Sequence, residues 1–185
     1  MNANVALIGS GNAFFTDEGI GLYAGKYLKE NFTFQPALDI IDGGTLGFGL
    51  MPLLQEYEMV IIANTSSDDS KAVGTIEVLS GEELIANQGI KKTANEVEIT
   101  EMLQICSMAK HCAAATMISI VPEDIISVSV EVTPALRAQW DRYIEVIVAE
   151  LTKCGITVAQ KSEVMSLDEI LEQFANPSIE HGKGF

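Results

Sequence analysis

Short, strongly apolar segments recur along the chain and alternate with stretches patterned for helices. Because these segments are apolar throughout, rather than at every second residue, we expect strands covered on both faces. Strands that alternate with helices predict an α/β fold, with a twisted, mostly parallel sheet sandwiched between helices. A chain of 185 residues suits a single domain with a sizeable core. The expected strands are residues 4–9, 37–42, 59–64, 75–79 and 115–121.

Helices are predicted between these strands. Residues 19–31 have helical spacing, and their apolar face consists of Ile20, Tyr23, Ala24, Tyr27 and Leu28. A short helix is expected over residues 48–56. Residues 96–112 predict another helix, whose inward side chains are Val97, Met102, Ile105 and Cys106.

The clearest helix signal spans residues 133–155. Thr133 stands where an N-cap belongs, Pro134 occupies the first helical position, and Gly155 lies just past the end. The last segment differs, because a short helix fits residues 167–174 and the rest resembles a flexible tail. We therefore predict an α/β domain over residues 1–160 and a C-terminal extension over residues 161–185.

Charge and cysteine content exclude several functions. A formal net charge of −15 argues against nucleic-acid binding and favours cationic partners. The three cysteines, Cys106, Cys112 and Cys154, contain no CxxC pair, so we expect reduced thiols rather than disulfides or structural zinc. The N-terminus lacks the basic segment of a signal peptide, and no apolar run approaches the roughly 20 residues that span a bilayer. We expect a cytoplasmic protein without membrane contact.

Polar residues follow three of the predicted strands. Ligands in open α/β sheets bind at the carboxyl ends of the strands. The residues at these ends are the loop 9–18, the segment Asp42, Gly43, Gly44 and Thr45, and the segment 64–66 that begins at Asn64. These three stretches of chain are expected to face one crevice.

The first of these loops contains the sequence GSGNAF, which resembles part of a dinucleotide-binding fingerprint. The fingerprint requires a third glycine at position 14, where this chain has Phe14. Nucleotide binding is therefore not predicted. We interpret Gly9 and Gly11 as sites of a tight turn or a close backbone approach.

Three acids lie near the predicted crevice. Asp17 fits a charge that complements the dipole of the helix after it. Glu18 is of interest if it points towards Asp42, because two carboxylates about 6 Å apart repel by roughly 3 kcal/mol at an effective dielectric near 20. Such a pair is relieved by a raised pKa or by a bound cation. Asp42 has two interpretations that remain open, a direct functional role and a turn acceptor that holds the glycines after it.

Nucleophilic catalysis has little support in the sequence. His111 lies at the end of a predicted helix and His181 lies in the predicted tail, so neither occupies a strand end. A Ser-His or Cys-His pair is not expected. The catalytic residues are therefore unknown at this stage.

Five sequence segments together carry a family resemblance: GSGNAFFTDEGIG, IIDGGTLG, VIIANTS, GTIEVL and VTPAL. In this order, over roughly residues 4–158, they resemble the hydrogenase maturation endopeptidases. The resemblance implies a protease that removes a C-terminal extension from the nickel-loaded large subunit of a [NiFe] hydrogenase. It also implies the large-subunit precursor as partner, with maturation chaperones as a further candidate.

The resemblance further implies a site that recognises the nickel already placed in the precursor. The family uses an acid in the first loop, an aspartate at the end of the third strand and a histidine at the start of a later helix. The first position matches Glu18, whereas the second is Asn64 and the third is Asn95 in this chain.

The two asparagines change the chemistry of that site. Carboxylate and imidazole groups are good nickel ligands, whereas side-chain amides are uncharged, weak oxygen ligands. One carboxylate and two amides should bind nickel much less well. Glu96 or Glu98 could replace a ligand if the helix begins one residue later, and the alternative is that both lie in a solvated first turn.

Three functions follow as hypotheses. The chain is an active endopeptidase with an altered metal site, or a catalytically degenerate relative that docks the precursor or an assembly factor. The third is a small-molecule-binding protein that kept only the fold.

Overall fold

The central element of the fold is a five-stranded sheet with strand order β3-β1-β4-β6-β5. The computed structural model describes residues 4–66, 68, 70–86 and 94–177, without the side chains of Ala94 and Asn95. The parallel strands are β1 (Val5–Ser10), β3 (Asp39–Gly44), β4 (Met59–Thr65) and β6 (Ala114–Ile120). At one edge, β5 (Ile76–Ser80) pairs antiparallel with β6. The expected mostly parallel sheet is confirmed.

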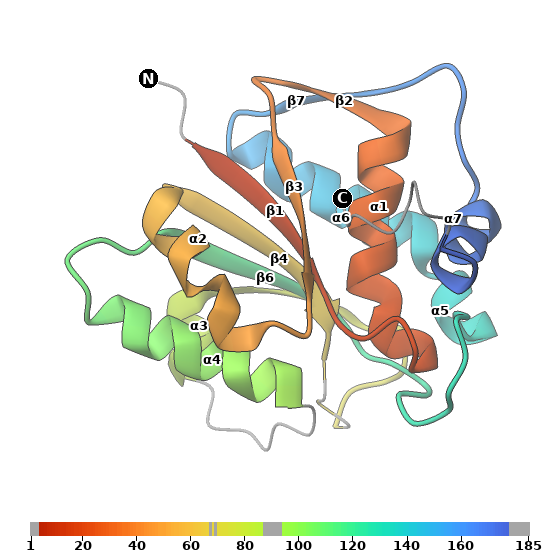
Figure 1. The fold of residues 1–185 in the computed structure, drawn as a ribbon, viewed down its shortest axis with the longest axis horizontal. Helices are drawn as coiled ribbons and strands as arrows, with labels where there is room; N and C mark the ends of the chain where they lie inside the picture. Colours follow the sequence, from red (N-terminus) through yellow and green to blue (C-terminus); the bar gives the residue numbers. More distant parts are fainter. Residues whose placement is uncertain (1–3, 67, 69, 87–93, 178–185) are drawn as a thin grey trace.

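Helices cover both faces of this sheet, as Figure 1 shows. One face carries α1 (Ile20–Asn31), α6 (Trp140–Lys153) and α7 (Leu167–Ala175). The opposite face carries α2 (Met51–Glu56), α3 (Gly81–Ala86) and α4 (Ala94–Ser107). Each layer has its own apolar core against the sheet. Within the described part of the chain, no helix is long and apolar enough to cross a membrane.

A second sheet was not predicted from the sequence. It pairs β2 (Phe32–Gln35), which begins directly after α1, with β7 (Thr157–Gln160) in antiparallel orientation. Both strands have four residues, and much of each is exposed to solvent. They therefore lack the continuous apolar pattern that marks the central strands.

The predicted helix over residues 133–155 is two helices in the structure. It consists of α5 (Pro134–Arg137) and α6, separated by Ala138 and Gln139. Thr133 does stand at the N-cap of α5, as predicted, but it makes no side-chain capping bond, because its hydroxyl donates a hydrogen bond to Asp17 Oδ2 at 2.9 Å. Pro134 does occupy the first helical position, and Gly155 lies past the end of α6 with a φ of +85°.

The inward face of α4 also differs from the prediction. Ile99, Met102, Leu103 and Cys106 form the buried stripe, at spacings of three and four residues. Ile105 lies on the flank of this stripe and is 45% exposed, so its predicted burial is wrong. The helix ends at Ser107 rather than at residue 112, since a tight turn follows it before β6. The three cysteines are free, as expected.

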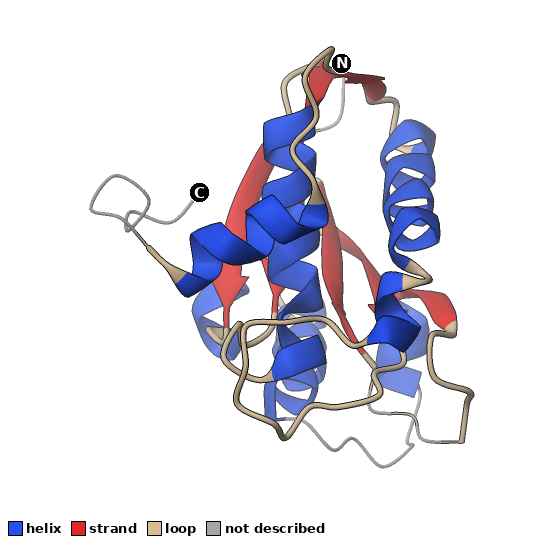
Figure 2. Cartoon of the chain, turned by 90° about the vertical axis from the view of Figure 1, so that its right-hand side faces the viewer, coloured by secondary structure: helices blue, strands red, loops and turns tan. Residues whose placement is uncertain are grey.

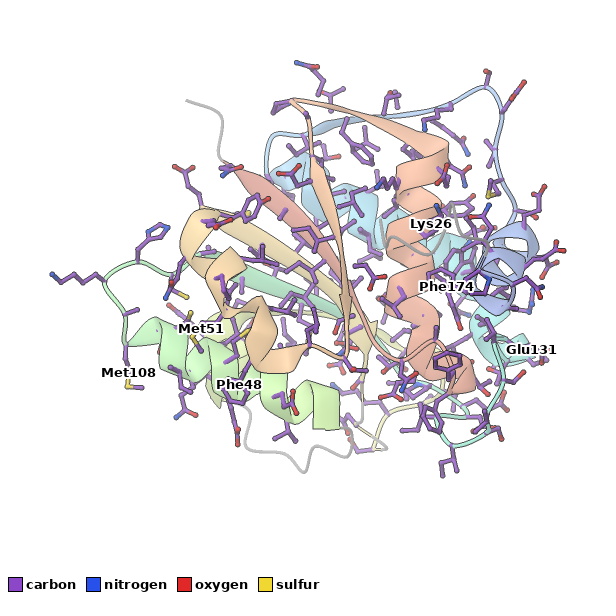
Figure 3. All side chains as sticks on the ribbon, viewed as in Figure 1. Lys26, Phe48, Met51, Met108, Glu131 and Phe174 are labelled. Carbon is purple, nitrogen blue, oxygen red and sulfur yellow. The ribbon has the colours of Figure 1, made fainter. Side chains whose placement is uncertain are left out.

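The C-terminal helix α7 packs on the same core as α1. It begins with a capping box in which Ser166 and Glu169 bond each other's backbone, and it buries Ile170 and Leu171. The ring of Phe174, labelled in Figure 3, packs edge to face against the ring of Tyr23, with 5.1 Å between the ring centroids. The predicted helix over residues 167–174 is confirmed, whereas residues 178–185 of the predicted tail lie outside the described residues.

A close contact between α1 and the sheet fixes the start of this helix. A Cβ on Gly21 would lie 2.3 Å from the carbonyl oxygen of Ser10 and 2.2 Å from that of Ala63. A Cβ on Gly9 would similarly meet the Gly21 carbonyl oxygen at 2.5 Å. Two glycines therefore allow the backbone of α1 to touch β1 and β4 near their carboxyl ends.

We expect Gly21→Ala to lower the free energy of unfolding by at least about 3 kcal/mol, at the upper end of the range for overpacked cores. The obstructing atoms are backbone oxygens of two central strands, which cannot rotate away. Chemical denaturation measures the change. The control is Gly81→Ala at the start of α3, where the new Cβ makes an ordinary 3.5 Å contact with Ala115. A loss below about 1 kcal/mol for Gly21→Ala would contradict the close packing.

Candidate functional site

The loops that follow the parallel strands gather at the carboxyl ends of these strands, at the lower end of the molecule in Figure 2. We call this end of the sheet the strand-end edge. Backbone hydrogen bonds join the loops. The Gly11 N–H after β1 donates to the Gly44 carbonyl at the end of β3, at 2.9 Å. The Gly74 N–H after β4 donates to the Val121 carbonyl after β6, at 2.8 Å. The segments that follow neighbouring strands are therefore bonded to each other at the carboxyl ends of the sheet.

The carboxylate of Asp17 fastens the loop after β1 to the loop after β6. Asp17 lies in the 3₁₀ helix η1 (Thr16–Gly19) and is fully buried. It accepts hydrogen bonds from the backbone N–H groups of Glu123, Asp124 and Thr133 at 2.8–3.0 Å. The Thr133 hydroxyl supplies a fourth at 2.9 Å. Our interpretation of Asp17 as a charge for the dipole of α1 was therefore incomplete, because its main partners lie more than 100 residues away.

Further backbone contacts extend this attachment. Ser129 donates its N–H to the Phe14 carbonyl at 3.0 Å, and Thr16 donates its own N–H to the Ser129 carbonyl at 2.9 Å. The Thr16 hydroxyl donates to the Ser127 carbonyl at 2.8 Å. Residues 14–17 and 124–133 are therefore held side by side by hydrogen bonds.

Glu18 follows Asp17 directly and lies beside these two hydrogen-bonded segments. Its side chain is half-buried, and burial alone raises the pKa of its carboxyl group. The pKa of Asp42 is also raised by burial, an effect opposed by the hydrogen bond from the Gly44 N–H at 2.9 Å. Burial, rather than repulsion between the two carboxylates, is the cause of both shifts. The structure shows Asp42 in the role of a turn acceptor.

The turn that Asp42 holds is tightly packed. Gly44 has a φ of +45°, which favours glycine. A Cβ on Gly43 would lie 2.6 Å from Ile8 Cγ2, so this residue must also be small. Thr45 is exposed at the end of the turn. Gly43 and Gly44 thus allow the tight turn at the end of β3, and Thr45 follows it at the surface.

Asn64 occupies the end of β4 and is 1% exposed. Its register partner on β6 is Ser119, which is also buried. Ile62 and Met117 belong to the core beneath α4, so the alternation of side chains places Asn64 and Ser119 on that same face. Asp42 alternates with Ile41 of the same core and therefore faces the α1 side. The structure does not bring Asp42 and Asn64 onto one face.

The first turn of α4 contributes Glu96 and Glu98 to the α4 side of this edge. Glu96 is 7% exposed, so the predicted solvated position is wrong for this residue, which packs inward. The Glu98 side chain lies over the backbone of Gly47 in the 3₁₀ helix η2 (Gly47–Leu50). Asn95 belongs to α4, and its side chain lies outside the described part of the structure. Among the described residues, no three His, Cys, Asp or Glu side chains are grouped to hold a metal ion.

Tyr143 supports the strand ends from the α6 side. Its hydroxyl lies 3.2 Å from the Asn64 carbonyl and 3.1 Å from the Ile118 carbonyl, and it donates to both strands. Burial raises the pKa of this hydroxyl, so it remains a donor throughout the physiological range. Sequence reasoning had not singled out Tyr143 or Ser119, because an apolar helix face and a strand give no signal for a single polar contact.

The chain is similar to known proteins along most of its length. The chain matches the sequence profile of the family described as hydrogenase maturation protease over residues 22–150. It is 26% identical to the hydrogenase expression/formation protein HupD of Rhodobacter capsulatus over 181 residues, 97% of this chain and 85% of that protein. It is 24% identical to the hydrogenase 2 maturation protease of Escherichia coli, covering 86% of this chain and 98% of the relative.

The fold is similar to solved structures of such proteins. The hydrogenase maturating endopeptidase HybD from Escherichia coli superposes with a TM-score of 0.79 at 24% identity. The match covers 86% of this chain and 98% of that structure. The two molecules therefore share the α/β fold.

Asp17→Asn should lower the free energy of unfolding by about 3 kcal/mol or more. Asparagine offers one acceptor oxygen in place of two, and each hydrogen bond to a charged group contributes about 1.5–3 kcal/mol. Denaturation gives the total change, and hydrogen exchange at Glu123, Asp124 and Thr133 should show faster exchange. Asp168→Asn, in an exposed ion pair with Arg137, is the control and should cost less than about 1 kcal/mol. An unchanged rate of backbone hydrogen exchange in residues 123–133 would contradict the role of Asp17 in holding this segment.

Glu18→Gln should stabilise the metal-free protein at neutral pH. Because the folded-state pKa of Glu18 is raised, the contribution of its carboxyl group to folding stability is complete at pH values below its ordinary pKa of 4.5. This contribution is lost as the pH rises through the raised pKa. The stability gain of the variant should therefore grow with pH above about 4.5. Denaturation at pH 4 to 8 measures it, with Glu163→Gln as an exposed control. A gain that does not change with pH would contradict the burial of this carboxyl group.

Proposed function

The chain belongs to the hydrogenase maturation protease family, and we propose that it removes the C-terminal extension from the nickel-loaded large-subunit precursor of a [NiFe] hydrogenase. The nickel belongs to the substrate, so the protein needs to contact it only while the precursor is bound. We place this reaction in the cytoplasm, with the large-subunit precursor as the partner and maturation chaperones as further candidates.

The single observation that carries this proposal is the position of Glu18. Its carboxyl group is half-buried at the strand-end edge, in the loop where the family uses an acid. The preceding residue, Asp17, holds this loop rigidly against the segment after β6. A carboxylate kept partly out of water gains more from an approaching cation than a fully solvated one does. Glu18 is therefore suited to contact the nickel of a docked precursor.

A second function is favoured by Asn64. This residue stands at the end of β4, where the family has an aspartate, and it is buried and uncharged. A neutral amide contributes little to nickel binding. We therefore keep a catalytically degenerate protein, which docks the precursor or an assembly factor without cleaving it, as the alternative function.

A cleavage assay on purified nickel-loaded precursor separates the two functions. We expect the wild type to release the C-terminal extension, and Glu18→Gln to lower kcat/KM by more than about 100-fold, since loss of even an outer-shell partner typically costs 10- to 100-fold. Glu145→Gln on the exposed face of α6 is the matched control and should cleave normally. The nickel-free precursor should remain uncut.

The opposite outcome is equally specific. If the wild type does not cut, and the double variant Asn64→Asp with Asn95→His does, the degenerate function is established. Calorimetric titration of each protein with Ni²⁺ then shows whether the two substitutions restored a metal site. Binding heat that Glu18→Gln abolishes would assign this carboxylate to the site in either case.

A further inference from the structure

Exposed apolar side chains are concentrated at the strand-end edge. Among the described residues, ten large hydrophobic side chains are exposed, and six of them lie in the connections that follow the carboxyl ends of the parallel strands. Those six are Phe14, Leu46, Phe48, Val73, Ile126 and Val128. The other four lie in β5, in α4, directly after α4 and in the segment before α7. A soluble protein that gathers such side chains at one end presents an interaction surface there.

Three of these residues form what we call the apolar rim: Phe14, Ile126 and Val128, which are 66%, 83% and 76% exposed. They lie on the segments 14–17 and 124–133. Asp17 and the backbone bonds of Ser129 with Phe14 and Thr16 hold these two segments together. Because this backbone is fixed by hydrogen bonds, the rim cannot easily fold its side chains inward. The apolar surface is therefore displayed in a preorganised form, which lowers the entropy cost of binding.

The rim has an acidic border. The strand-end segments 11–19, 42–50, 64–75 and 121–133 together contain eight Asp or Glu, of which Asp17 is buried, and one basic residue, against 26 and 11 in the whole chain. The one basic residue, Lys71, forms ion pairs with Asp68 and Glu77. Glu123 and Glu131 are exposed on the same segment as Ile126 and Val128, and Figure 3 shows Glu131 at the margin of the molecule.

This charge pattern decides between possible occupants. A second copy of the chain would bring an equally acidic border to the rim, and like charges across an interface disfavour association. A membrane with anionic lipids would be repelled in the same way. The surface instead complements a polypeptide segment whose apolar side chains are flanked by Lys or Arg.

We propose that the apolar rim and its acidic border are the docking surface for the hydrogenase large-subunit precursor. The bound part is a segment that presents apolar side chains beside basic ones, and it lies against Phe14, Ile126 and Val128. This inference rests on the proposed function for the identity of the partner. Since Phe14 precedes Glu18 by only four residues, a precursor bound to the rim has its metal centre near Glu18.

The first test measures binding of wild type and variants to immobilised, purified precursor. The double variant Ile126→Ser with Val128→Ser, and separately Phe14→Ser, should weaken Kd about 10- to 100-fold, the range for loss of central apolar contacts. The matched control is the double variant Ile105→Ser with Met108→Ser. Ile105 lies in the last turn of α4 and Met108 just after the helix, with exposed fractions of 45% and 77%, and Figure 3 places Met108 on the opposite side of the molecule from Glu131. The control should bind as the wild type does.

The second test addresses the acidic border. Glu123→Gln with Glu131→Gln should slow association and weaken its dependence on salt, because rim charges act mainly on the rate of encounter. Glu145→Gln with Glu163→Gln removes the same charge from distant exposed positions and should leave the rate within about twofold of the wild type. Equal effects of the two pairs would overturn the role of the border.

Binding and cleavage measured together distinguish this inference from the proposed function. In a competent protease, the apolar-rim variants should raise KM with kcat nearly unchanged. If the wild type binds the precursor through the rim but never cuts it, docking stands and the protease function fails. If the variants bind and cleave as the wild type does, docking at the rim is overturned while the protease function stands. Loss of a dimer in the variants, seen by sedimentation with unchanged precursor binding, would assign the rim to self-association and overturn the proposal.

Discussion

The buried carboxylate of Asp17 is the interaction on which the strand-end edge depends. It satisfies three backbone N–H groups and one hydroxyl of a segment that crosses the end of the sheet without regular secondary structure. A buried charge is tolerated only when hydrogen bonds replace its hydration, so the carboxylate and the segment require each other. The half-buried position of Glu18 and the exposed positions of Phe14, Ile126 and Val128 are both consequences of this attachment.

The attachment works because α1 begins at a fixed place on the sheet. Gly21 lets the helix backbone touch β1 and β4, so η1 is carried directly over the ends of these strands. Tyr23, one turn into the helix, donates its hydroxyl to the Ala13 carbonyl at 3.0 Å and packs against Phe174 of α7. The C-terminal helix therefore supports the first loop of the site through a single aromatic side chain, although it lies about 150 residues further along the chain.

The fold could be predicted from local pattern, whereas much of the site could not. Continuous apolar runs identified the central strands because burial on both faces leaves a signal in consecutive residues. The function of Asp17 depends on donors more than 100 residues away, and no local pattern contains them. The same contact occupies the Thr133 hydroxyl, so Thr133 stands at the predicted N-cap without the side-chain capping bond that this position usually supplies. Glu96 was misplaced because a glutamate in a first helical turn is usually solvated, and its burial in this protein comes from tertiary packing that the local sequence does not show.

The position of Asn64 links the stability of this edge to its chemistry. An ionised aspartate at a site 1% exposed would lose most of its hydration, and that cost must be offset by hydrogen bonds or by a bound cation. Asparagine keeps the shape and the polarity without this requirement, so the ends of β4 and β6 remain stable when no metal is present. Under the function that we propose, the same exchange removes a charge that would attract the nickel of the precursor. A protein of this kind would obtain more of its selectivity for the precursor from contacts outside the metal site, and the apolar rim with its acidic border beside Glu18 is the surface that we propose for such contacts.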